Sequence, residues 1–361
     1  MSFSQLANTA VNHVRKLADV MPAVFFVGGF VWDALTIGRN VAPLDLWIFA
    51  GYLFCAAVIL YLIGRPVPLE NSESKLVSVF RKVYSPRLPY FLLQFLFGSL
   101  FSALFILYFK SSSHWLAWLM SLVLAGLLVA NEFLESEYKR FTLSWSMFGL
   151  CAMLLFNFAL PFLLGSIHAV WFYLSTLLGA GLAFWLYKKT PNHLGSIKPV
   201  AGIAVLLMLA YAVDMIPPVP LVKRDVAMAF ALEKANGQYR LSQQASPWWM
   251  LLRKTSNDLE MLAGQRVYCF SSIFAPPGLQ AKLYHRWQHY DKKQGWVTQS
   301  RIGFSMSGGR YEGFRGYTYK SSLAEGDWRV SVETENEKTI TVHKFTVHHV
   351  ETAPQRVVLL Y

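Results

Sequence analysis

The sequence predicts a polytopic α-helical membrane bundle of about seven transmembrane helices, followed by an antiparallel all-β sandwich domain. Charged residues make up only 15% of the chain, against roughly 25% in soluble domains. Apolar stretches of transmembrane length recur up to residue 217, and beyond it the apolar runs become short and alternating. We therefore expect a transmembrane helical domain at residues 1–217 and a β-sandwich domain at residues 218–361.

The charged residues are distributed unevenly along the chain. Residues 1–221 contain 14 Lys/Arg and 9 Asp/Glu, whereas residues 222–361 contain 19 and 12. The last two-fifths of the chain thus has the composition of an ordinary soluble domain. The two regions are expected to have different solvents, lipid for the first and water for the second.

The seven expected helices follow from apolar stretches of about 17–25 residues, which are long enough to cross the hydrocarbon core. They are residues 20–37, 44–63, 90–109, 114–130, 144–164, 169–187 and 199–217. Asp33 interrupts the first stretch, which also resembles a signal peptide because Arg15 and Lys16 precede it. Further spans follow and no small-x-small cleavage site ends it, so we expect a retained helix.

Basic residues in the loops predict the orientation. With the N-terminus in the cytoplasm, the inside segments carry 12 Lys/Arg and the outside loops carry two, Arg39 and Lys110. This is the positive-inside bias of membrane proteins. Seven spans then place the C-terminal domain on the opposite side, which in a bacterium is the periplasm. We expect a multi-pass protein of the bacterial inner membrane, with a cytoplasmic N-terminus and a periplasmic C-terminal domain.

Several function classes lack their sequence signatures. The net charge of +12 could suit nucleic acid, but the chain has no long Lys/Arg run and no recognition-helix or finger pattern. Its three cysteines form no CxxC or Cys/His metal spacing. Neither a Gly-x-Ser-x-Gly motif nor a phosphate-binding loop is present. We therefore expect no nucleic-acid partner, no metal, no cofactor and no catalytic residue that could be named.

Ionisable residues at membrane depth are functional candidates by default. The expected topology places Asp33, Asp45, His114, His168 and Asp214 toward the outer leaflet. One hypothesis is an outward-facing polar pocket, with Asp33, Asp45, His168 and Asp214 holding a cation or a lipid headgroup. The other is that these groups reach headgroup water, or pair with the basic residues that follow the last span. The sequence leaves both open.

The region after the prolines at 217, 218 and 220 reads as short strands separated by turns. Candidate strands are residues 226–232, 238–241, 266–274, 281–289, 296–305, 317–320, 328–333 and 339–347. Asn236-Gly237 is a hairpin-turn signal. Short strands at this spacing favour an antiparallel sandwich.

A glycine-rich segment at residues 307–320 is the most distinctive part of this domain. Glycines permit close backbone approach to a ligand, while aromatic rings and arginines can bind sugars or anions. The candidate binding residues here are Arg310, Tyr311, Phe314, Arg315, Tyr317 and Lys320. The conspicuous run His285-Arg286-Trp287 adds three more candidates. The alternative is a bulged hairpin loop whose rings pack on the sheet and whose arginines bridge to the membrane half.

The same residues carry a family resemblance. Leu283-Tyr284-His285-Arg286-Trp287, Gly295-Trp296, the 308–320 loop and Gly326-Asp327-Trp328-Arg329-Val330 resemble the bacterial family called domain of unknown function 2914, over roughly residues 265–350. The resemblance implies a β domain of the cell envelope, attached to the inner membrane of a Gram-negative bacterium. It implies no activity and no catalytic residues.

Two functions from different classes remain. The first is a non-enzymatic inner-membrane protein whose periplasmic domain binds an envelope ligand, either a glycan or an anionic group, or a protein partner. The second is an enzyme or transporter that acts at the outer leaflet on a lipid-linked substrate. In either case the expected partners are the lipid bilayer and an envelope glycan, lipid or membrane protein.

Overall fold

The computed structural model describes residues 43–64, 88–111, 115–235, 237–246, 255–275, 281–306, 314–352 and 354–361, together with residues 30, 31, 33 and 35. The chain divides into two compact units. The first unit comprises Met1–Ile106, Val123–Ala152 and Gly181–Ala201. The second comprises Leu107–Leu122, Met153–Ala180 and Gly202–Tyr361, and it contains all the strands found in the described residues.

Six α-helices lie in the described ranges, where the sequence predicts seven. They are α2 (Pro43–Ile63), α4 (Leu88–Ser111), α5 (Trp115–Glu132), α6 (Phe141–Leu164), α7 (Ala169–Lys189) and α8 (Lys198–Ala212). All but α8 are long and apolar enough to cross a membrane, as expected of a membrane protein. The first expected span, residues 20–37, falls mostly outside the described residues, of which Phe30, Val31, Asp33 and Leu35 are helical.

The outward faces of the long helices are apolar. Trp47, Phe54 and Leu163 are each about 70% exposed, and many other large apolar side chains of these helices are exposed as well. A water-soluble protein rarely exposes so extensive an apolar surface. Lipid is therefore the solvent that suits these helices.

Gln94 of α4 and Asn131 of α5 satisfy each other within the first unit. The Gln94 amide donates to the carbonyl oxygens of Asn131 and Glu132, at 3.1 and 3.0 Å. In return, the Asn131 amide donates to Gln94 O at 3.0 Å. These bonds use the last carbonyls of α5, which have no partner within their own helix.

The last helix is shorter than the sequence predicts. We expected residues 199–217, but α8 ends at Ala212 after 15 residues, about 22 Å at 1.5 Å per residue. Asp214 adopts a left-handed conformation with φ 62°, and Met215 N donates to Ala210 O at 2.9 Å. These features form a Schellman cap. The prolines at 217 and 218 then prevent any continuation of the helix.

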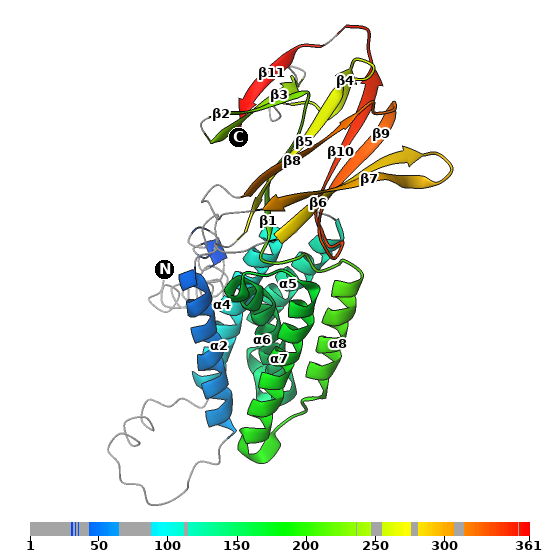
Figure 1. Cartoon of the computed structure of the whole chain (residues 1–361). Coiled ribbons are helices and arrows are strands. Elements are labelled where there is room, and N and C mark those ends of the chain that lie inside the picture. The colour runs from blue at the N-terminus through cyan, green and yellow to red at the C-terminus, as the bar shows by residue number, and fades with distance from the viewer. Residues whose placement is uncertain are drawn as a thin grey trace, which may run out of the picture. The chain divides into compact units, whose positions relative to one another are not determined.

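Eleven strands follow α8 among the described residues, more than the eight expected. They are β1 (Val222–Ala229), β2 (Ala231–Ala235), β3 (Gln238–Gln244), β4 (Asp258–Met261), β5 (Arg266–Phe274), β6 (Ala281–Asp291), β7 (Gly295–Met306), β8 (Phe314–Ser321), β9 (Gly326–Thr334), β10 (Thr339–His349) and β11 (Arg356–Leu360). They form three sheets, with strand orders β1-β5-β8, β4-β10-β9-β6-β7 and β11-β3-β2 (Figure 1). Every pair is antiparallel except β4 with β10, which is parallel.

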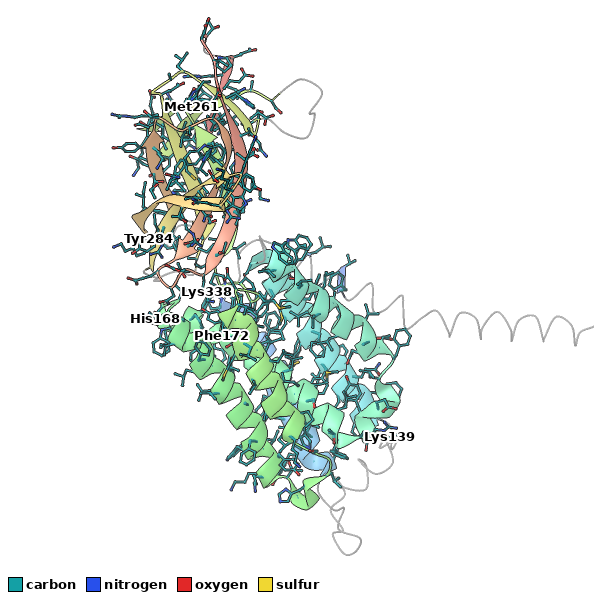
Figure 2. All side chains as sticks on the ribbon, turned by 90° about the vertical axis from the view of Figure 1, so that its right-hand side faces the viewer. Lys139, His168, Phe172, Met261, Tyr284 and Lys338 are labelled. Carbon is teal, nitrogen blue, oxygen red and sulfur yellow. The ribbon has the colours of Figure 1, made fainter. Side chains whose placement is uncertain are left out.

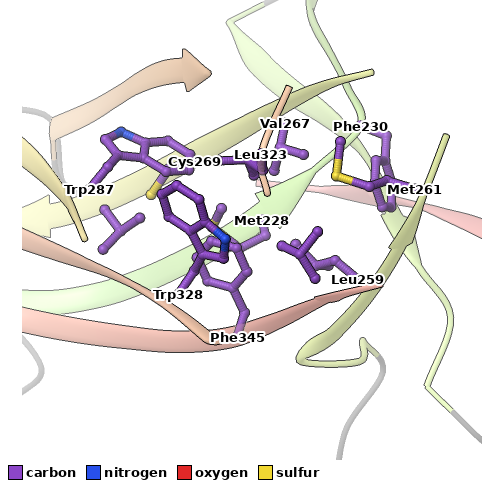
Figure 3. Packing of buried hydrophobic residues seen from close by; sticks show 12 residues of the cluster. Met228, Phe230, Leu259, Met261, Val267, Cys269, Trp287, Leu323, Trp328 and Phe345 are labelled. Atoms are coloured by element: carbon purple, nitrogen blue, oxygen red, sulfur yellow. The ribbon is translucent and has the colours of Figure 1, made fainter. Parts of the chain in front are cut away.

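The hydrophobic core of the β domain lies between the β1-β5-β8 sheet and the five-stranded sheet. Met228 and Cys269 come from the first sheet, and Trp287, Trp328 and Phe345 come from the second (Figure 3). The alternation of each strand sends every second residue into this core. Antiparallel sheets packed face to face in this way agree with the expected sandwich, apart from the parallel β4.

Candidate ligand-binding surfaces

Tyr268, Tyr317 and Tyr319 form one aromatic surface, which we call the tyrosine platform. Tyr268 lies on β5, and the register pairs it with Tyr319 on β8. Tyr317 shares a face with Tyr319 because side chains two residues apart on a strand point the same way. The ring centroid of Tyr268 lies 5.6 Å from that of Tyr319 and 6.2 Å from that of Tyr317. These separations are typical of interacting aromatic rings.

The platform is open at the surface of the β domain. Tyr317 is 42% exposed and Tyr319 is 50% exposed. None of the three tyrosine hydroxyls makes a hydrogen bond to another described residue. The platform therefore offers apolar ring faces beside unused polar groups.

The tyrosine platform occupies only part of the outer face of the β1-β5-β8 sheet. The β11-β3-β2 sheet covers another part of that face. Phe270, on the same face of β5 as Tyr268, is fully buried and lies 5.2 Å from the ring of Tyr239 on β3. Tyr239 also contacts the platform, since its ring centroid lies 6.3 Å from that of Tyr317. Tyr239 therefore lies at the border between the covered part of the face and the exposed Tyr317 and Tyr319.

Two arginines flank the platform. The Arg266 guanidinium carbon lies 5.3 Å from the ring centroid of Tyr319. Arg315 Nη1 donates to Gly237 O at 3.0 Å, in the turn that joins β2 and β3. Arg315 also shares the outward face of β8 with Tyr317. Cations next to exposed rings add sites for acidic or hydroxyl groups of a ligand.

His285 and Trp287, two of the residues singled out in the sequence, are fully buried in the β-domain core. His285 Nε2 is hydrogen-bonded to Ser271 Oγ, and its Nδ1 lies 2.8 Å from Thr318 Oγ1. Trp287 Nε1 donates to the same threonine oxygen at 3.2 Å. Burial lowers the pKa of His285 to about 3, so the ring is neutral near pH 7. These contacts join the two sheets.

The other candidates from that motif and the glycine-rich segment are dispersed. Arg286 points away from the core and forms an ion pair with Glu333. Phe314 is buried in the core at the start of β8. Lys320 Nζ donates to Ser300 Oγ at 3.3 Å. Of the predicted binding residues, only Arg315 and Tyr317 are at the platform, and Arg310 and Tyr311 lie outside the described residues.

One known protein family matches part of the β domain. The family of proteins of unknown function DUF2914 matches residues 280–347, which run from the start of β6 almost to the end of β10. Residues 280–347 are a DUF2914 domain. This confirms the resemblance stated from the sequence. No curated protein matches the chain.

Solved structures similar to the chain have low scores. An immunoglobulin-like protein from Pseudomonas aeruginosa has a TM-score of 0.20 and 6% identity, covering 35% of this chain and 98% of its own. A β-glucosidase from Listeria innocua in complex with gluconolactone has a TM-score of 0.20 and 9% identity, covering 37% and 17%. Likenesses at these TM-scores carry no argument about the fold or function of this chain.

The tyrosine platform extends beyond the DUF2914 domain. Tyr317 and Tyr319 belong to the domain, but Arg266 and Tyr268 come from β5, which precedes it. The alternation in Tyr317-Thr318-Tyr319 was visible in the sequence. The partners on β5 were not identifiable, because only the cross-strand register of β5 and β8 brings them together.

The four residues of the hypothetical polar pocket are split between the two units. Asp33 and Asp45, the latter in the first turn of α2, belong to the first unit. His168 and Asp214 belong to the second. His168 Nδ1 accepts the Val170 amide hydrogen at 3.4 Å, at the start of α7. Their convergence into one pocket stays a prediction.

Within the second unit, Asp214 contacts the turn between β9 and β10. Both Asp214 carboxylate oxygens lie 3.3 Å from the Thr339 amide nitrogen, which donates to them. Lys338, labelled in Figure 2, lies at the end of α8. Its Nζ donates to Tyr211 O at 2.5 Å and to Ala212 O at 3.1 Å, the last carbonyls of the helix. Burial lowers the pKa of Lys338, and the nearby Asp214 opposes that shift. The hairpin therefore caps the end of α8.

Metal-binding chemistry has no geometric basis in the part of the chain that the structure describes. No group of three or more His, Cys, Asp or Glu side chains there could hold a metal ion. Cys269, on β5, is a free thiol buried in the core of the β domain, and burial raises its pKa. A buried neutral thiol is a packing residue rather than a nucleophile.

Proposed function

We propose that this chain is a bacterial inner-membrane protein that presents its β domain in the periplasm, where the tyrosine platform binds a cell-envelope glycan. The location is supported by the positive-inside bias, with 12 Lys/Arg in the inside segments and two in the outside loops. Helices long and apolar enough to span a membrane support a membrane anchor. An exported domain would meet the glycans of the envelope.

The observation that carries the proposal is the set of three adjacent tyrosines, the half-buried Tyr268 and the exposed Tyr317 and Tyr319. Their hydroxyls make no hydrogen bond to another described residue. A sugar ring has an apolar face of C–H groups and a rim of hydroxyls, so it can stack on a ring and hydrogen-bond beside it. Tyrosine gives a large, rigid, amphipathic contact area at low cost in conformational entropy. Arg266 and Arg315 supply donors at the border of the platform.

A direct binding measurement tests this function. The full chain, purified in a mild uncharged detergent, is titrated with glycan strands released from peptidoglycan and with chito-oligosaccharides, by calorimetry. We expect saturable binding to at least one of them. Tyr317→Ala and Tyr319→Ala should each weaken it by about tenfold, equivalent to ~1.4 kcal/mol.

Tyr290→Ala is the matched control, because Tyr290 is similarly exposed, at 44%, and lies on β6 of the other sheet. This variant should bind the glycan as the wild-type chain does. If no glycan binds, or if platform and control variants bind equally well, the glycan-binding proposal is wrong. Recovery of a protein that competes at the platform in place of a glycan would also overturn it.

A further inference from the structure

The outer face of the five-stranded sheet carries a concentration of cations that the tyrosine platform does not involve. Strand alternation directs Arg286 of β6, Arg301 of β7, Arg329 of β9 and Lys344 of β10 to this face. The register pairs Arg286 with Arg301, and Arg329 with Lys344. Like charges directly opposite each other are destabilising unless something compensates them.

The carboxylates on the face compensate only part of this charge. Glu333 has a fully buried side chain, forms an ion pair with Arg286, and lies 3.7 Å from Arg301 Nε. Asp327 Oδ1 accepts a hydrogen bond from Thr346 Oγ1 at 3.0 Å. Asp258 and Glu260 of β4 and Lys282 of β6 also point to this face. Among the described cations of the face, only Arg286 and Arg301 form ion pairs.

The Arg301 side chain already makes several contacts within the protein. Its Nη2 donates to the carbonyl oxygens of Thr334 and Glu335, both at 3.1 Å. Its guanidinium carbon lies 3.9 Å from the ring centroid of Tyr284. These contacts leave Arg301 few donors for a ligand. Arg329 and Lys344, which the register places opposite each other, form no ion pair among the described residues.

Arg329 is held in a fixed orientation with its outer end free. Its Nε donates to Gln288 Oε1 at 2.7 Å, and Gln288 Nε2 in turn donates to Thr298 Oγ1 at 3.0 Å. Its guanidinium carbon lies 4.5 Å from the ring centroid of Trp296. Among the described residues, neither terminal nitrogen of Arg329 has a hydrogen-bond acceptor, and the exposed Lys344 ammonium has none either.

We propose that Arg329 and Lys344 bind a phosphate group of a soluble ligand on the outer face of the five-stranded sheet. The two free terminal nitrogens of Arg329 form a fork that matches two phosphate oxygens, and Lys344 supplies a point charge beside it. A dianionic phosphate brings two negative charges to these two cations, whereas a single carboxylate brings one. Partial burial and the neighbouring Arg286 lower the pKa of Arg329, and the nearby Glu333 opposes that shift.

The surroundings favour a soluble ligand over a membrane surface. A membrane-inserting surface exposes large apolar side chains beside its cations. Neither β9 nor β10 exposes such a side chain among its described residues. Apart from Trp296 beside Arg329 and its neighbour Tyr290, the described residues around the site expose no large apolar side chain that would hold a lipid acyl chain. It is independent of the tyrosine platform, so either proposal can fail without the other.

Phosphate binding is measured with the full chain in uncharged detergent, by calorimetry or phosphorus NMR. The probes are inorganic phosphate, glucose 1-phosphate, acetate, and vesicles that contain phosphatidic acid. We expect both soluble phosphates to bind and acetate to bind more weakly by about tenfold. Binding should weaken as salt is raised. Absence of phosphate binding, equal binding of acetate, or binding to vesicles alone would each overturn the proposal.

The variants Arg329→Gln and Lys344→Gln should each weaken phosphate binding by about tenfold. Lys344→Gln is the cleaner test, because Lys344 makes no described hydrogen bond that folding could depend on. Lys282→Gln is the matched control, since exposed Lys282 lies at the far end of β6 from Gln288. It should change the affinity by less than about twofold. An equal loss in all three variants would mean diffuse charge attraction and no site.

Discussion

At the scale of the residue, strand alternation decides what each member of His285-Arg286-Trp287 contacts. His285 and Trp287 point into the core and meet at Thr318. Arg286, between them, points to the opposite face and pairs with Glu333. A run that looks like one binding motif in the sequence therefore serves two structural purposes on two faces of β6.

The buried neutral His285 makes the stability of the β domain depend on pH. The pKa of His285 is about 3 in the folded chain and 6.5 without burial. The unfolded chain therefore binds a proton below pH ~6.5 that the folded chain does not bind. The contribution of this residue is fully present above pH ~6.5 and is lost toward pH 3 at about 1.4 kcal/mol per pH unit.

Denaturant unfolding of the full chain between pH 4 and pH 7 measures this dependence. The His285→Gln variant should be less stable at pH 7 but should lose less stability on acidification than the wild-type chain. His348→Gln is the control, because His348 is exposed on β10, and its pH dependence should match the wild type. Equal slopes for wild type and His285→Gln would contradict a neutral His285.

Gly316, in the glycine-rich segment, is needed for packing. A Cβ atom at this position would lie 2.7 Å from Phe304 Cε2, closer than carbon atoms pack. Phe304 in turn contacts the His285 ring, with centroids 4.4 Å apart. Gly316→Ala should destabilise the β domain by about 1–3 kcal/mol, measured as a lower melting temperature.

Gly202→Ala is the control for this substitution. Gly202 is also a glycine within a regular element, α8, but a Cβ atom there would meet nothing within 4 Å. Alanine also favours the helix. No loss of stability is expected. If Gly316→Ala proved as harmless as this control, the close packing on Phe304 would be refuted.

At the scale of the element, the end of α8 depends on the β9–β10 turn. Lys338 donates to two terminal carbonyls of the helix, and Asp214 accepts the Thr339 amide hydrogen. Lys338→Met keeps the aliphatic chain but removes the charge and both hydrogen bonds. Because hydrogen bonds from charged donors contribute about 1.5–3 kcal/mol, we expect a clearly lower melting temperature for the full chain.

The exposed Lys292, at the turn between β6 and β7, supplies the matched substitution Lys292→Met. It should leave the melting temperature unchanged, because the side chain makes no described hydrogen bond. A Lys338→Met variant as stable as Lys292→Met would show that the cap on α8 contributes nothing.

The elements differ in how far the sequence determines them. Long apolar runs predicted α2, α4, α5, α6 and α7 closely, because lipid requires continuous apolar helices. The end of α8 was placed five residues too late, since the left-handed Asp214 and its partner Thr339 are a long-range effect. β4 was missed because four residues that pair in parallel with β10 carry little periodic signal.

The candidate site was only partly predictable, for the same reason. Tyr317 and Arg315 were identified from their composition and spacing. Tyr319 lies in the same segment and, by strand alternation, on the face of Tyr317, but it was not among the candidates. Tyr268 was missed because its contact with them depends on the register between β5 and β8. A sequence shows which residues of one strand share a face, but it does not show which strand lies alongside.

At the scale of the whole molecule, the chain combines parts with different solvents. The long helices expose apolar side chains, which suits lipid, whereas the β domain buries a core of its own between two sheets. Glycan binding in the envelope requires that the β domain lie across the membrane from the basic loops. That arrangement depends on α8, which has 15 residues, completing the last crossing.

The most direct measurement of this arrangement is a topology assay in living bacteria, with an enzyme reporter that is active only after export. Fused after Tyr361, the reporter should be active, and inserted at Glu70, in the basic segment between α2 and α4, it should be inactive. A second reporter that works only in the cytosol should give the reverse pattern. Cytosolic activity at Tyr361 would contradict an exported β domain, and with it the binding of an envelope glycan.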